Sequence, residues 1–222
     1  MLFDLFRNGL SMDLIISLCA RVFIIFCVLP IHEFAHGYVA NKLGDPTARL
    51  SGRLTMNPLA HIDPLGSLMI ILVGFGYAKA VPVNMRNFKP SKRKKYMALT
   101  ALAGPVSNVI MAFIFTFLYC LIYYKFAFNE MMTYVALFFM YAATVNVSLA
   151  VFNLIPIPPL DGSRILNAIL PDSVYYKMMQ FERYIVLGVF ALILLGVLDT
   201  PISLGTSFLQ NIIFKICCAP FV

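Results

Sequence analysis

The order of apolar and polar positions along the chain predicts several membrane-spanning helices. Crossing the hydrocarbon core of a bilayer takes about 20 helical residues. Apolar runs of adequate or nearly adequate length are 22–41, 97–124, 131–152 and 185–198, and a weaker one, interrupted by a glycine and a glutamine, is 202–222. Residues 1–20 mix polar and apolar positions and are expected to lie along the membrane interface. The pattern therefore indicates an all-α polytopic membrane protein with about four to five transmembrane helices.

Residues 45–95 have a different texture, which predicts a small element at the membrane edge. The stretches 47–57 and 77–88 alternate polar with apolar or β-branched residues, as short strands do. Between them, the apolar run 64–76 is short for a crossing and is typical of a re-entrant segment. We therefore expect a membrane-edge β element together with a segment that enters the membrane and returns.

Composition and charge agree with a membrane protein. Hydrophobic residues make up 61% of the chain and charged residues 12%, whereas soluble proteins have about a quarter charged. The net charge is +7, but the basic residues gather in loops, above all in 89–96. There we expect contact with anionic headgroups of the lipid bilayer and no nucleic acid. We expect a single membrane domain, 1–222, with its core at 22–170 and accessory C-terminal helices at 171–222.

The cysteines are expected to behave as small hydrophobic residues. They form no CxxC pair and lie in apolar segments, so the pattern predicts neither a disulfide framework nor a zinc ribbon. The five are Cys19, Cys27, Cys120, Cys217 and Cys218.

The sequence HEFAH places three ionisable side chains inside the first apolar run. On a helix, residues i and i+4 share a face, so His32 and His36 offer two imidazoles to one metal ion. Glu33 lies one position round, within reach of a water on that ion without being a ligand, as in two-histidine zinc proteases. An ionisable residue inside a span costs at least ~2–3 kcal/mol, and a bound ion compensates for this cost. The motif predicts one zinc ion, with Glu33 as the catalytic base.

A catalytic zinc ion needs a third protein ligand, and the residues leave two candidates. Asp161 lies in LIPIPPLDG (154–162), a proline-rich break after the third apolar run. Irregular backbone at membrane depth is tolerated where it is buried in protein or lines a wet cavity, which favours Asp161. The competing candidate is His61, the remaining histidine, and spacing alone does not decide between them.

Three motifs, in this order, resemble the site-2 protease family of intramembrane zinc metalloproteases. They are HEFAH in the first span, AGPVSN (103–108) early in the second, and NLIPIPPLDG (153–162) after the third. The resemblance covers 22–170 and is to the compact subgroup without PDZ or CBS domains. It implies that His32 and His36 bind zinc, that Glu33 is the catalytic glutamate and that Asp161 is the third ligand.

The resemblance also implies a further site residue and a function. Asn153 matches a family asparagine near the active site, where its amide would steady the substrate backbone or a developing oxyanion. The implied activity is an endopeptidase that hydrolyses peptide bonds in or near transmembrane helices of single-span membrane proteins, in regulated intramembrane proteolysis. The alternative is a non-catalytic zinc-binding adaptor or a transporter, although a transporter would distribute polar residues along several spans.

The basic residues predict the orientation of the chain in the cell membrane. The cluster 92–95 places the start of the second strong span on the cytoplasmic side, and the third span returns there. Asp161 then lies toward the cytoplasm, and the active site of this multi-pass protein is expected within the membrane toward that side. For His32 and His36 to share a metal ion with Asp161, the segment 64–76 must not cross the membrane.

Overall fold

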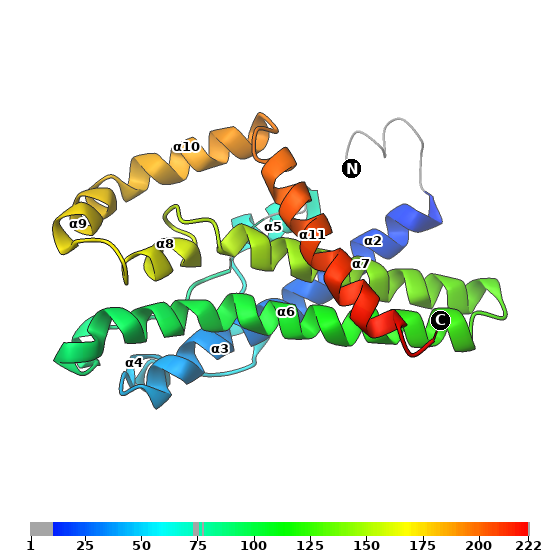
Figure 1. Cartoon of the computed structure of the whole chain (residues 1–222), viewed down its shortest axis with the longest axis horizontal. Coiled ribbons are helices and arrows are strands. Elements are labelled where there is room, and N and C mark those ends of the chain that lie inside the picture. Colours follow the sequence, from blue (N-terminus) through cyan, green and yellow to red (C-terminus); the bar gives the residue numbers. More distant parts are fainter. Residues whose placement is uncertain (1–10, 73–75, 77, 222) are drawn as a thin grey trace.

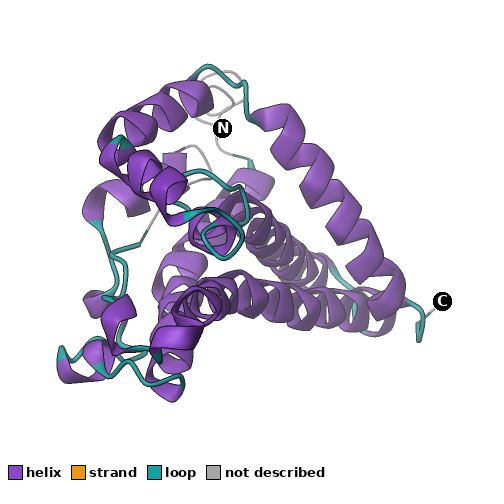
Figure 2. Cartoon of the chain, turned by 60° about the vertical axis from the view of Figure 1, so that its left-hand side comes forward, coloured by secondary structure: helices purple, strands orange, loops and turns teal. Residues whose placement is uncertain are grey.

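The computed structural model describes residues 11–72, 76 and 78–221. This part of the chain consists of helices joined by turns and loops (Figure 2). Within it, three helices are long and apolar enough to cross a membrane: Met12–Lys42, Pro90–Lys125 and Glu130–Asn153. They correspond to the three strongest apolar runs of the sequence, and any further span stays a prediction.

The first span is a continuous helix made of three parts. These are α2 (Met12–Phe23), the π-helical turn η1 (Ile24–Val28) and α3 (Leu29–Lys42), which carries HEFAH. Ser11 begins the helix, because its hydroxyl oxygen accepts a hydrogen bond from Leu14 N at 3.2 Å. Residues 12–20, which were expected to lie along the membrane interface, form the first turns of this continuous helix, and their depth in the membrane stays a prediction; residues 1–10 lie outside the described part.

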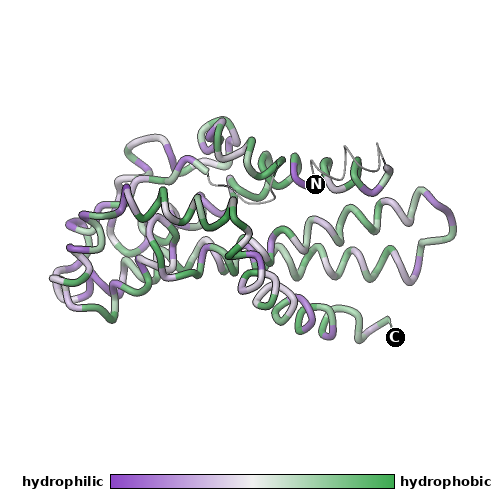
Figure 3. Tube along the Cα trace, turned by 90° about the horizontal axis from the view of Figure 1, so that it is seen from above, coloured by the Kyte–Doolittle hydropathy of each residue, from purple (hydrophilic) through white to green (hydrophobic). Residues whose placement is uncertain are grey.

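The second and third spans form an antiparallel hairpin on which the first span packs (Figure 1). They are α6 (Arg93–Lys125) and α7 (Glu130–Asn153). Within the first span, α2 packs against α7 and α3 packs against α6. A shared apolar cluster, which includes Ile24, Val28, Phe115 and Leu149, holds the three together. Figure 3 shows apolar residues along the long helices and polar residues gathered at their ends.

Residues 45–92 connect α3 to α6 through short helical turns, and the described part contains no strand. The elements are α4 (Thr47–Leu50), η2 (Pro58–Ala60), α5 (Pro64–Leu72), η3 (Met85–Asn87) and η4 (Pro90–Lys92). The predicted strands are therefore not confirmed, and for 47–50 the prediction is wrong. Of the apolar segment 64–76, Pro64–Leu72 form α5, and residues 73–75 lie outside the described part, so the expectation that this segment does not cross stays a prediction.

Four helices follow α7. They are α8 (Asp161–Leu166), α9 (Asp172–Gln180), α10 (Glu182–Leu194) and α11 (Asp199–Cys218). The glycine and the glutamine that interrupt the last apolar run both lie within α11 and pack on α7. Gly205 approaches Val151 so closely that a β-carbon there would lie 2.8 Å from Val151 Cγ1. Gln210 Nε2 donates to Thr144 Oγ1 at 2.8 Å.

A disulfide corrects the expectation for two of the cysteines. Cys120 on α6 is bonded to Cys218 at the end of α11. The pairing is distant in sequence, and neither residue belongs to a CxxC pair, so no local pattern indicates it. The other three, Cys19, Cys27 and Cys217, are free thiols, as expected.

Candidate metal centre

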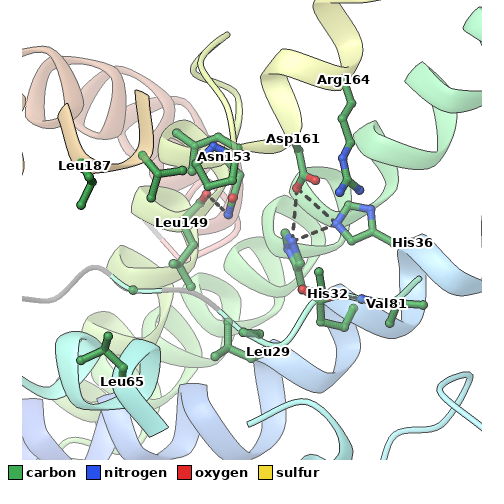
Figure 4. A pocket seen from close by; sticks show the side chains of 17 residues that line it. Leu29, His32, His36, Leu65, Val81, Leu149, Asn153, Asp161, Arg164 and Leu187 are labelled. Carbon is green, nitrogen blue, oxygen red and sulfur yellow. Dashed lines mark hydrogen bonds and ion pairs between the residues drawn. The ribbon is translucent and has the colours of Figure 1, made fainter. Parts of the chain in front are cut away.

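Three side chains from two distant segments converge on one point (Figure 4). His32 and His36 lie one turn apart on α3, and Asp161 is the first residue of α8. The two Nε2 atoms are 3.0 Å apart, and Asp161 Oδ2 lies 3.4 Å from the Nε2 of His32 and 3.2 Å from that of His36. All three residues are buried, with exposed fractions of 5–8%.

This donor set fits a zinc ion. Zinc bound by nitrogen and oxygen at about 2.0–2.1 Å in tetrahedral geometry separates neighbouring donor atoms by about 3.3 Å. The three observed separations, 3.0–3.4 Å, match one face of such a tetrahedron. Two imidazoles and one carboxylate leave a fourth position for water or substrate, which is the ligand count of a catalytic zinc site.

Helix α6 fixes the histidines from behind. The backbone carbonyl of Thr100 accepts a hydrogen bond at 2.7 Å from His36 Nδ1, which leaves Nε2 with its lone pair toward the cluster. Gly104, in the motif AGPVSN, lies directly against both rings: a β-carbon there would lie 2.3 Å from His36 Nε2 and 2.5 Å from His32 Cε1. The motif therefore matters here because its glycine lets α6 approach the metal centre.

Glu33 lies beside the cluster and is held by the segment that precedes α6. Its Oε2 accepts a hydrogen bond from the backbone N–H of Val81 at 2.9 Å. Asp45, which is buried, holds the same segment by accepting from Asn84 N at 2.6 Å and from Asn87 Nδ2 at 2.7 Å. The loop after α3 and residues 81–87 are thus fastened together around the glutamate.

The cluster opens into a cavity of about 670 Å³. Its wall is mainly apolar and combines residues of α3, α7, α8 and α10 with Gly76, Ala78, Ala80 and Val81. Asn153 lines this cavity, but its Nδ2 donates to Leu149 O at 2.9 Å, one turn back in α7. The amide therefore caps its own helix while facing the cavity.

Arg164 is a site residue that the sequence reasoning missed. It lies one turn after Asp161 on α8, is partly buried, and is the one Lys or Arg among the described residues that line this cavity. Figure 4 shows its guanidinium directed toward Asp161 and His36. The signal was present in the sequence, since a helix beginning at Asp161 places position i+3 on the same face.

His61, the competing third ligand, lies outside the cluster. Its ring is almost fully buried, and Nε2 donates to the backbone carbonyl of Thr55 at 2.8 Å. Its own carbonyl accepts a hydrogen bond from Lys79 N at 2.8 Å. His61 therefore holds loop segments together, and the structure brings Asp161 rather than His61 to the two histidines.

Comparison with known proteins agrees with this geometry. Residues 20–197 match the model of peptidase family M50. A candidate zinc metalloprotease of Bacillus subtilis, YwhC, is 47% identical over 158 residues, which cover 69% of this chain and 70% of YwhC. A candidate zinc metalloprotease of Mycolicibacterium smegmatis, Rip2, is 30% identical over 60% of this chain and 51% of Rip2.

An archaeal relative extends the comparison. The candidate zinc metalloprotease MJ0611 of Methanocaldococcus jannaschii is 31% identical over 61% of this chain and 63% of its own length. No solved structure matches the chain. The match to the family model covers most of the sequence and includes all three motifs, so the chain belongs to peptidase family M50, the site-2 protease family.

Proposed function

We propose that this protein is an intramembrane zinc endopeptidase that hydrolyses peptide bonds in or near transmembrane helices of single-span membrane proteins. Membership of the M50 family supports a metalloprotease. The observation that carries the proposal is the convergence of His32, His36 and Asp161 at the wall of an apolar cavity, with Glu33 beside them. A cavity of this kind suits an apolar substrate segment rather than a soluble peptide.

The metal would be one zinc ion held by the two Nε2 atoms and by Asp161 Oδ2. Zinc supplies Lewis acidity: it lowers the pKa of a bound water to about 7 and polarises a carbonyl. Thr100 and Gly104 would keep the imidazoles in place, the first by its hydrogen bond to His36 and the second by leaving room for the rings.

Glu33 would move the proton. Its carboxylate takes a proton from the attacking water, and the same proton then goes to the nitrogen of the leaving amine as the C–N bond breaks. The hydrogen bond from Val81 N fixes Oε2, so the carboxylate has a defined direction relative to the cluster. Water adds across the peptide bond, and the products are a carboxylate and an amine.

Two further residues would contact substrate. Asn153 faces the cavity from the end of α7, where an amide is placed to hold substrate backbone. Arg164 faces the metal cluster, where a guanidinium is placed to bind the carbonyl oxygen as negative charge develops and the new carboxylate after cleavage. The loop segment that contains Ala78, Ala80 and Val81 lines the cavity, and an unwound substrate would pair with this segment as an added strand.

Charge supports the proposed orientation, with the active site toward the cytoplasm. The cations 92–95 stand at the start of α6, and such clusters stay on the cytoplasmic side. Lys94 Nζ donates to Leu170 O at 2.8 Å, which fastens the region after α8 to this end of α6. Asp161 begins α8 and therefore belongs to the same side of the bundle.

Cysteine chemistry supports the same orientation independently. Disulfides persist in oxidising compartments and are rare in the cytosol. Cys120 lies near the end of α6 that is opposite to the basic cluster, and it is bonded to Cys218. The basic residues at one end of the bundle thus indicate the cytoplasmic side, and the disulfide at the other end indicates the side that faces an oxidising compartment.

The test compares the wild-type protein with Glu33→Gln in lipid vesicles that contain a single-span substrate. We expect Glu33→Gln to keep one zinc ion per chain and to lose cleavage, and a chelator to remove both from the wild type. Glu130→Gln is the matched control, because Glu130 is exposed at the first turn of α7 and does not line the cavity. Full cleavage by Glu33→Gln would refute the role of Glu33. A zinc-loaded wild type that cleaves no member of a substrate panel would favour the zinc-binding adaptor.

A further inference from the structure

A second cavity, distinct from the metal centre, lies where α6 begins. Its volume is about 710 Å³. The wall combines the turn 90–92 and the start of α6 with Met85 on one side and with Ile165 and Ala168 on the other. Two segments that are distant in sequence, 85–102 and 165–168, therefore build it, and we call it the basic cavity.

The charge of the basic cavity has one sign. Its described lining includes Lys92, Arg93, Lys94 and Lys95 and no acidic residue. Two of these cations fasten its walls: Arg93 donates to Arg86 O at 3.3 Å, and Lys94 donates to Leu170 O at 2.8 Å. Lys92 and Lys95 are exposed at its rim. Lys92 and Lys95 therefore direct their charge outward, while the hydrogen bonds of Arg93 and Lys94 hold the wall of the cavity in place.

The rest of the basic cavity is apolar and continues along the outer face of α6. Ala98, Leu99 and Leu102 line it from α6. Beyond them, at helical spacing on the same face, Val106 and Ile110 are 45% and 54% exposed, comparable with 40% for Leu99. A ligand that fits here carries an anionic group at one end and an apolar chain at the other.

We propose that the basic cavity binds one anionic phospholipid of the cytoplasmic leaflet. Its phosphate lies against Lys92 and Lys95, and one acyl chain follows the apolar face of α6 from Leu99 downward. The helix at residues 90–125 is 36 residues long, about 54 Å, and therefore exceeds the ~30 Å hydrocarbon core. Its first turns accordingly stand at headgroup level, where such a lipid presents its phosphate.

The site also has a structural consequence for α8. Ile165 lines the basic cavity, whereas Asp161 and Arg164 of the same short helix line the catalytic cavity. A lipid in the basic cavity therefore packs against the same short helix that supplies the proposed third metal ligand. Occupancy is expected to stabilise the folded protein because the ligand binds this arrangement and not the unfolded chain.

The test measures lipid binding to the full chain and needs no protease activity. In detergent, the purified protein is titrated with fluorescent phosphatidylglycerol, and phosphatidylcholine serves as the neutral comparison. We expect Lys92→Gln/Lys95→Gln to weaken phosphatidylglycerol binding by roughly tenfold or more and to remove its thermal stabilisation. The matched control is Lys89→Gln/Lys177→Gln, which removes two exposed charges outside the cavity lining and is expected to change binding less than about threefold.

Three outcomes would overturn the proposal. Equal weakening by the two double variants would mean that the protein responds to total charge alone. Equal binding of phosphatidylcholine would remove the role of the anionic group. Displacement of the lipid by millimolar inorganic phosphate or glycerol phosphate would indicate a site for a soluble phosphate. None of these results bears on the metal centre, so failure here leaves the proposed protease activity standing.

Discussion

Gly104 provides the sharpest test of the metal centre, because its missing side chain is what lets α6 touch both histidines. We predict that Gly104→Ala loses the metal ion while keeping the fold. The added β-carbon would stand 2.3 Å from His36 Nε2 and 2.5 Å from His32 Cε1. Each ring would have to retreat by about 1 Å to reach ordinary van der Waals contact at 3.4 Å.

A displacement of about 1 Å is enough to disrupt metal coordination but costs less than the free energy that holds the protein folded. Metal–ligand distances hold to within about 0.2 Å, so a shift of about 1 Å removes a ligand from the ion. His36 cannot rotate away without breaking its 2.7 Å hydrogen bond to Thr100 O. Overpacking of this size costs about 1–3 kcal/mol, below the usual 5–15 kcal/mol free energy of unfolding. We therefore expect zinc affinity to fall by about 100-fold or more in a protein that still folds.

The assay is zinc content per chain after dialysis, together with substrate cleavage and the midpoint of thermal unfolding. Gly188→Ala is the control, because a β-carbon at Gly188 on α10 meets no atom within 4 Å; it is expected to leave zinc content and cleavage unchanged and to raise the unfolding midpoint slightly, since alanine favours a helix over glycine. If Gly104→Ala retains one zinc ion and wild-type cleavage, the close contact between α6 and the histidines is not required, and the reasoning from it is wrong.

Two other residues give independent predictions. Burial raises the pKa of Asp45, but hydrogen bonds from Thr47 and Asn87 outweigh this and hold the pKa below its ordinary value. The folded state thus favours the ionised form, so its contribution to the free energy of unfolding is present above about pH 4 and is lost as the pH falls. We expect Asp45→Asn to lower the free energy of unfolding by about 1–3 kcal/mol at neutral pH, and so to lower the unfolding temperature. The stability of this variant should also vary less with pH below about pH 5, and an unchanged pH dependence of stability would contradict the reasoning. Arg164→Met is expected to keep zinc and to lower kcat by about 10–100-fold. It should also lose inhibition by peptides with a free terminal carboxylate, while amidated peptides bind as before. Arg164→Lys is expected to restore part of the rate and part of the carboxylate inhibition. Equal loss of both peptide classes would instead indicate a structural role for Arg164.

Strong periodic signals in the sequence predicted the main helices and two of the three residues of the candidate metal centre. The three long apolar runs became the spans, because length and apolarity alone determine whether a helix suits the bilayer. His32 and His36 followed from the i, i+4 rule, which is a property of one helix and needs no tertiary information. The third ligand required a contact across more than a hundred residues, so the residues alone left His61 open beside Asp161.

The failures concern residues whose structure is set by specific hydrogen bonds rather than by periodicity. Residues 47–50 alternate like a strand but form a helical turn, next to Asp45, whose Oδ1 accepts from Thr47 N at 3.1 Å. Side chains that bond to nearby backbone compete with strand formation, and alternation cannot reveal this. Likewise Gln210 interrupts an apolar pattern, yet its partner Thr144 on α7 lets α11 continue.

The first span shows how one local irregularity serves the site. A regular α-helix would keep the same side turned toward the same neighbour along its length, but in this span α2 packs on α7 and α3 packs on α6. The change falls at the π-helical turn, where Leu29 N donates to Ile24 O, five residues back. Pro30, which has no N–H to donate, follows at once, and a proline ring is accommodated by such a wider turn. Because the turn rotates the helix beyond it, apolar residues of α2 pack on α7 while the HEFAH residues face α6. Pro30, two residues before His32, is therefore part of what brings the two histidines against α6.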